Sequence, residues 1–107
     1  MGIQTNTIPL VHYQIEQTDA FLQWRDTLRN PVAKAAIARR IQRMAQGNMG
    51  DVKSVGDGVS EARVDVGAGY RLYFTTRDRT VIFLLCGGSK STQEADIKTA
   101  RKLAQEV

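Results

Sequence analysis

The sequence predicts an α+β fold in which helices pack on a mostly antiparallel, five-stranded sheet. Apolar residues recur at helical spacing early in the chain, at period two between residues 51 and 85, and again at helical spacing near the C-terminus. Short glycine-rich or polar turns separate the period-two segments, as in consecutive β-hairpins. We expect the helices to cover one face of the sheet and to leave the other face largely open.

Composition indicates a small globular protein. The 107 residues are 42% hydrophobic and 24% charged, which suits one domain spanning residues 1–107. Lys and Arg exceed Asp and Glu by 15 to 11, a surplus that permits a nucleic-acid partner without demonstrating one. Cys86 is the single cysteine, so no internal disulfide is possible. Because we find no signal peptide and no apolar run of membrane-spanning length, we expect a cytoplasmic protein.

The first predicted element is a strand. Residues 8–15 (IPLVHYQI) have β-branched and aromatic character, and Pro9 favours an edge position in the sheet. His12 lies within this strand. A partly exposed edge-strand histidine explains it better than a catalytic one, because no second histidine exists to share metal or proton transfer.

Two helices follow, joined by a short break. The stretch TDAFLQWRDTLR places apolar residues at helical spacing, with Thr18 or Asp19 as the cap. In the stretch NPVAKAAIARRIQRMAQGN, Asn30 caps the second helix, Pro31 occupies its first turn and Gly47 ends it. The sequence therefore predicts an antiparallel helical hairpin.

The second half of the chain predicts four more strands and a terminal helix. The expected strands are 51–56, 59–66, 70–76 and 80–85. The last of these, TVIFLL, is apolar on both faces and is therefore expected inside the sheet. The capping box formed by Ser91 and Glu94 predicts that the final helix begins there and runs to the C-terminus.

The hairpin SEARVDVGAGYRLYF is the most informative segment. A three-residue loop at 67–69 sets its register. The cross-strand pairs predicted from this loop are Val66–Tyr70, Asp65–Arg71, Arg63–Tyr73 and Glu61–Thr75. We therefore expect Arg63, Arg71 and Tyr73 to share the open face, about 5 Å apart across the strands.

Such a cluster suits cleavage of RNA through its own 2′-hydroxyl group. Arg63 and Arg71 stay protonated, so they can position the phosphate and stabilise its charge. A lysine among cations releases its proton more readily, which makes Lys53 or Lys90 a candidate base or acid. Tyr73 could stack on a base or donate a proton. This scheme needs no metal and no cofactor.

The residues alone favour a simpler interpretation. An uncovered sheet face must be polar, and Asp65 with Arg71 would form an ordinary cross-strand ion pair worth under ~1 kcal/mol. None of these patterns is as specific as a set of metal ligands. From these residues alone, we prefer an ordinary solvated sheet face to a nuclease site.

The stretches GNMGDVKSVGDGVSE, GAGYRLYF and GGSKSTQEADI carry a resemblance to a known family. Over residues 8–105 the chain resembles the RelE/ParE toxin superfamily, and most closely its HigB-like branch of addiction module killer proteins. The resemblance implies a RelE-like fold and a type II toxin neutralised by a cognate antitoxin, of helix-turn-helix type. It further implies a ribosome-dependent mRNA endoribonuclease, or mRNA interferase, that cuts in the A site without metal and blocks translation.

The resemblance also implies roles for individual residues. Arg71 in GYR matches the phosphate-stabilising arginine of the family, and Arg63 falls where a basic catalytic residue is common. Lys90 after GG falls at the position of another cation, and Lys53 is carried over from the segment DVKSVG. Some relatives place a tyrosine in the last helix and some HigB members use histidines, and the last helix of this chain has neither. Tyr73 or a lysine must then supply the general base.

Two other interpretations stay open. ParE relatives share the fold but inhibit DNA gyrase without being enzymes, and in them the sheet arginines would be scaffold or contact residues. A degenerate member retained only as a binding partner would show no toxicity on expression.

Overall fold

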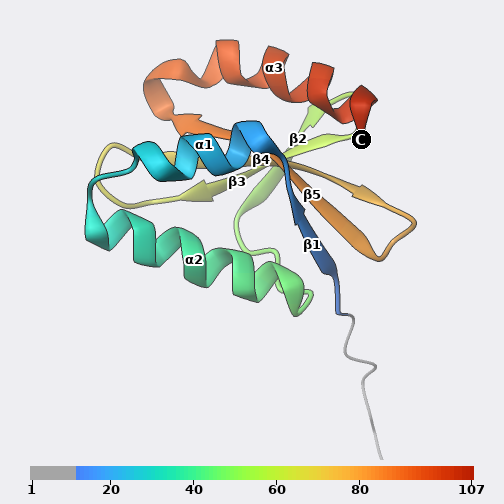
Figure 1. Ribbon diagram of the computed structural model, residues 1–107, viewed down its shortest axis with the longest axis horizontal. Coiled ribbons are helices and arrows are strands. Elements are labelled where there is room, and N and C mark those ends of the chain that lie inside the picture. Colours follow the sequence, from blue (N-terminus) through green and yellow to red (C-terminus); the bar gives the residue numbers. More distant parts are fainter. Residues whose placement is uncertain (1–11) are drawn as a thin grey trace, which may run out of the picture.

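The computed structural model describes residues 12–107 and confirms the predicted α+β class. Its elements are β1 (Gln14–Gln17), α1 (Asp19–Thr27), α2 (Pro31–Ala45), β2 (Val52–Gly56), β3 (Val59–Val64), β4 (Tyr70–Arg77), β5 (Val81–Ser89), the 3-10 turn η1 (Lys90–Thr92) and α3 (Gln93–Glu106). The five strands lie in the order β1-β5-β4-β3-β2 (Figure 1). The sheet is mixed, because β1 pairs parallel with β5 while the other three pairings are antiparallel.

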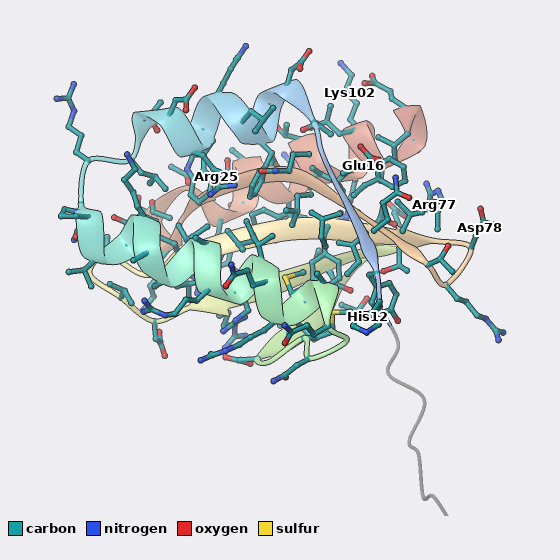
Figure 2. All side chains as sticks on the ribbon, turned by 60° about the horizontal axis from the view of Figure 1, so that its bottom comes forward. His12, Glu16, Arg25, Arg77, Asp78 and Lys102 are labelled. Carbon is teal, nitrogen blue, oxygen red and sulfur yellow. The ribbon has the colours of Figure 1, made fainter. Side chains whose placement is uncertain are left out.

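The N-terminal strand lies at the edge of the sheet, as Pro9 suggested. Residues 8–11 of the expected strand 8–15 lie outside the described residues, and β1 itself spans Gln14–Gln17. His12 precedes it and is exposed, at the lower end of β1 in Figure 2. Its position agrees with a solvent-facing histidine.

One face of the sheet is covered by α1 and α2, which run in opposite directions (Figure 1). The Thr18 hydroxyl accepts a hydrogen bond from the Phe21 N–H, and the Asn30 carboxamide accepts one from the Val32 N–H. Both caps satisfy N–H groups that have no partner inside the helix. The buried residues of this layer are Phe21, Ile37, Met44, Ala62, Val64, Leu72, Phe74, Ile82 and Leu84. No helix in the described part of the chain is long and apolar enough to cross a membrane.

The other face is covered by α3, so the expectation of an open face is wrong. A second core lies between this helix and the sheet, formed by Val59, Tyr73, Leu85, Cys86, Ala100 and Ala104. The reason is visible in β5, whose residues are apolar on both sides and so require cover on both faces. The small side chains of Ala100 and Ala104 let α3 lie close to the strands. The sheet is therefore the middle of three layers (Figure 1).

The glycine pair at the end of β5 allows both layers to approach the sheet closely. A Cβ atom at Gly87 would overlap the Trp24 ring of α1, and one at Gly88 would overlap the Asp96 carboxylate of α3. β5 continues through both glycines to Ser89, beyond the expected end at residue 85, because Gly87 and Gly88 pair with Leu72 and Arg71 of β4.

The start of the last helix also differs from the prediction. The chain leaves β5 through η1, and α3 begins at Gln93. The Ser89 N–H donates to the Thr92 hydroxyl at 3.2 Å. The capping residues are thus Ser89 and Thr92, and the predicted box of Ser91 and Glu94 is wrong, because the chain makes a 3-10 turn before the α-helix.

Candidate functional site

The register of β3 and β4 decides which side chains meet. The pairs are Glu61–Tyr73, Ala62–Leu72, Arg63–Arg71 and Val64–Tyr70. The prediction placed Arg63 opposite Tyr73, so the observed register is shifted by two residues. The cause is the turn: β3 ends at Val64, and the Gly69 N–H donates to the Val66 carbonyl within a longer connection. Because the shift is even, the arginines still share one face.

A buried carboxylate lies at the centre of this face. Glu61 has no exposed surface, and its Oε1 accepts a hydrogen bond of 2.6 Å from the Nε–H of Arg71. Gln93, from the first turn of α3, donates to both carboxylate oxygens at 3.1 and 3.0 Å. The Nε of Arg63 lies 3.8 Å from Oε1. Glu61 therefore replaces Asp65 as the partner of Arg71, and Asp65 is exposed.

The two arginines differ in how far they reach solvent. The Arg71 side chain is 11% exposed and that of Arg63 is 39% exposed. Two like charges directly across a strand pair repel each other, and the carboxylate between them offsets that repulsion. Since Glu61 engages Arg71 through Nε, the two terminal nitrogens of that guanidinium are not used by this bond. A guanidinium oriented in this way is suited to a phosphate group.

Lys90 lies at the same corner of the sheet. Its backbone N–H donates to the Gly69 carbonyl at 2.9 Å. A Cβ atom at Gly69 would stand 3.8 Å from Nη1 of Arg71 and 3.9 Å from Cβ of Lys90, so both side chains border this glycine. Lys90 is exposed. We define Arg63, Arg71 and Lys90, with Glu61 beneath them, as the cation cluster.

Tyr73 does not belong to the surface of this cluster. The side chain is fully buried under α3, and its hydroxyl has no hydrogen-bond partner among the described residues. Burial raises the pKa of Tyr73 above its ordinary value, and the charge of Glu61 raises it further. The expectation that Tyr73 faces a nucleotide is therefore wrong, because α3 covers the sheet face that we expected to be open.

Lys53 lies one strand further from the cluster. It is exposed on β2, in register with Glu61 of β3. Paired residues of neighbouring strands point to the same face, so Lys53 shares the face of the cluster but is separated from β4 by β3. Gln93 was not predicted as part of the site. Its sequence position marks only a helix start, and no local pattern shows which strand that helix end contacts.

Comparison with solved structures identifies the class of fold. The chain superposes on a double mutant of the E. coli toxin RelE in the free state with a TM-score of 0.64 and 15% sequence identity, covering 85% of this chain and 95% of that chain. The fold is RelE-like.

Sequence comparisons define the family. Residues 25–106 match the family described as "Phage derived protein Gp49-like (DUF891)", and the chain belongs to this family. An uncharacterized protein of Haemophilus influenzae is 51% identical over 94 residues, which cover 88% of this chain and 95% of that protein.

Proposed function

We propose that this protein is the toxin of a type II toxin–antitoxin system and that it blocks translation as a ribosome-dependent mRNA endoribonuclease of the HigB-like kind. The RelE-like fold supports this proposal, because the matched structure is described as a toxin. The observation that carries it is the buried Glu61, which holds Arg71 by a hydrogen bond of 2.6 Å beside Arg63 and Lys90. A polar sheet face does not require a fully buried carboxylate to orient one of its arginines.

The cluster provides what cleavage through a 2′-hydroxyl requires. The 2′-oxygen attacks phosphorus, the bond from phosphorus to the 5′-oxygen breaks, and negative charge builds on the non-bridging oxygens. Arg71 and Arg63 stabilise that charge with fixed cations. Lys90, the flexible cation at the corner, transfers a proton to the departing 5′-oxygen. Lys53, the other lysine on this face, accepts the proton of the 2′-hydroxyl group.

The proposed function implies two partners. The cation cluster is small compared with a flexible mRNA, so the ribosome supplies the positioning of the substrate. A cognate antitoxin of helix-turn-helix type keeps the toxin inactive. The proposal therefore includes a cytoplasmic location.

Primer extension on a defined mRNA in a purified translation reaction tests the proposal. The wild-type protein should cut the mRNA only when ribosomes are present, and Arg71→Ala should not cut. Arg77→Ala is the matched control, because Arg77 lies on the same strand but near its other end, on the order of 20 Å away. It should cut like the wild type.

The alternative function is tested by the same preparation. If no cut appears with or without ribosomes, the nuclease proposal fails. Inhibition of supercoiling by DNA gyrase would then identify a ParE-like gyrase inhibitor.

A further inference from the structure

We propose that Gln93 and Glu61 act as a positioning pair for Arg71, so that the first turn of α3 sets how accurately this guanidinium meets the scissile phosphate. This inference rests on the proposed function for its substrate. It assigns to Gln93 a role that does not require contact with RNA.

The hydrogen bonds of the pair define the orientation of the carboxylate. Arg71 donates to one oxygen of Glu61, which limits the rotation of the carboxylate about its terminal bond. The Nε2 of Gln93 donates to both oxygens, Oε1 at 3.1 Å and Oε2 at 3.0 Å, and so holds the end of the Glu61 side chain in place from the side of α3. Since Glu61 is fully buried, water does not compete for these bonds.

Gln93 is itself held in place by the backbone of α3. Three residues further along the helix, Asp96 packs against Gly88 of β5 so closely that no Cβ atom fits between them. Asp96 also accepts a hydrogen bond of 2.5 Å from the Thr92 hydroxyl. The start of α3 is thus fixed on the sheet, and the carboxamide of Gln93 is placed by a rigid element.

This arrangement matters because arginine has a long side chain. Holding its guanidinium in one position costs conformational entropy. Because the bond to Glu61 forms when the protein folds, this cost does not arise again when the substrate binds. A phosphate then meets a guanidinium that is already oriented. Loss of the pair should therefore lower the rate of the chemical step more than the affinity for mRNA.

Kinetics on mRNA-programmed ribosomes test this prediction. Gln93→Ala should lower kcat roughly 10- to 100-fold with little change in KM. The control is Glu94→Ala, which changes the next residue of the same turn, an exposed one. It should leave both constants near the wild-type values. A Gln93→Ala protein with wild-type kcat would overturn the inference.

A second readout does not depend on activity. The side-chain Nε–Hε signal of Arg71 in a 15N-correlated NMR spectrum reports its bond to Glu61. Gln93→Ala should shift this signal and speed its exchange with water, while Glu94→Ala should not. A lowered kcat with an unchanged Arg71 signal would also overturn the inference, because Gln93 would then act by another route.

A third variant covers the case in which Gln93→Ala fails to fold. Exchanging the two residues, Glu61→Gln with Gln93→Glu, keeps the net charge and allows a hydrogen bond between the two side chains in the reverse direction. Its Arg71 should bind a neutral carbonyl in place of a carboxylate, which is a weaker acceptor, and the Nε–Hε signal should move upfield. An unmoved signal would show that Glu61 does not hold Arg71. If the wild-type protein cleaves no mRNA, the proposed function fails, while the NMR readout still decides whether the pair orients Arg71.

Discussion

Asp96 of α3 lies directly over Gly88 of β5, with its carboxylate in the space that a Cβ atom would fill. The hydroxyl of Thr92 borders the same space, 2.8 Å from that position. The contact joins the start of the last helix to the strand that leads into the cation cluster.

Gly88→Ala should therefore destabilise the protein. The added methyl group forces α3 away from β5, and overpacking of this kind costs about 1–3 kcal/mol. Urea unfolding followed by circular dichroism measures the loss. Adding Asp96→Ala to this variant removes the overlapping carboxylate and should recover part of the loss. Gly88→Ala with wild-type stability would contradict the close packing.

Tyr73→Phe tests the burial of the tyrosine hydroxyl. Because this hydroxyl has no partner in the described structure, its removal should leave the free energy of unfolding within about 1 kcal/mol of the wild type, or raise it. The rate of mRNA cleavage should not change. A variant that folds normally but loses cleavage would restore Tyr73 as a catalytic residue.

The buried thiol of Cys86 should make stability depend on pH in the alkaline range. Burial, with the charge of Asp96, raises the pKa of Cys86 from 9.0 to about 12. Below pH 9.0 the thiol is neutral in both states, so its contribution to stability is complete. Between pH 9.0 and about 12 only the unfolded thiol ionises, and stability falls by up to about 1.4 kcal/mol per pH unit.

Urea unfolding of the wild type and of Cys86→Ala at several alkaline pH values measures this effect. The alanine variant loses packing at every pH, so the comparison concerns the slope alone. Its stability should fall less steeply above pH 9.0 than that of the wild type. Parallel curves would show that the thiol is not buried as described.

Arg77 and Arg71 should give different results in the cleavage assay when each is changed to alanine. Arg77 lies at the far end of β4, near the C-terminal part of α3 (Figure 2), where its guanidinium donates to the Ala104 carbonyl at 2.6 Å. Its loss should cost about 1.5–3 kcal/mol of stability and leave cleavage intact below the unfolding temperature. Arg71→Ala should abolish cleavage. Thermal unfolding and primer extension on the same preparations separate the two effects.

The elements of this fold could be predicted because they are encoded locally. The caps at Thr18 and Asn30 and the period-two segments gave the helices and most strands in their observed places. The face on which the last helix packs could not be predicted in the same way. An amphipathic helix shows which of its own sides is apolar, but its pattern does not say which face of the sheet it covers.

The candidate site was predicted only in part, because the face of the arginines is encoded locally while their partners depend on tertiary packing. The prediction that Arg63 and Arg71 share a face holds although the predicted loop length was wrong. The reason is that a register shift of an even number of residues leaves every side chain on the same face. The predicted partner of Arg71 was wrong, because Arg71 binds Glu61 and not Asp65. Gln93 is separated from Glu61 by 32 residues, so only the packing of α3 on the sheet brings the two together.

The single-turnover rate of mRNA cleavage on programmed ribosomes, compared between the wild type and Arg71→Lys, tests the central claim most directly. Lysine keeps the positive charge but lacks both the Nε–H that binds Glu61 and the planar fork that faces the phosphate. We predict a fall in rate of roughly 100-fold under conditions in which both proteins are fully folded, together with a lower urea midpoint, because the hydrogen bond to the buried Glu61 is lost. A wild-type rate in Arg71→Lys would contradict the assignment of Arg71 as the oriented phosphate-binding group.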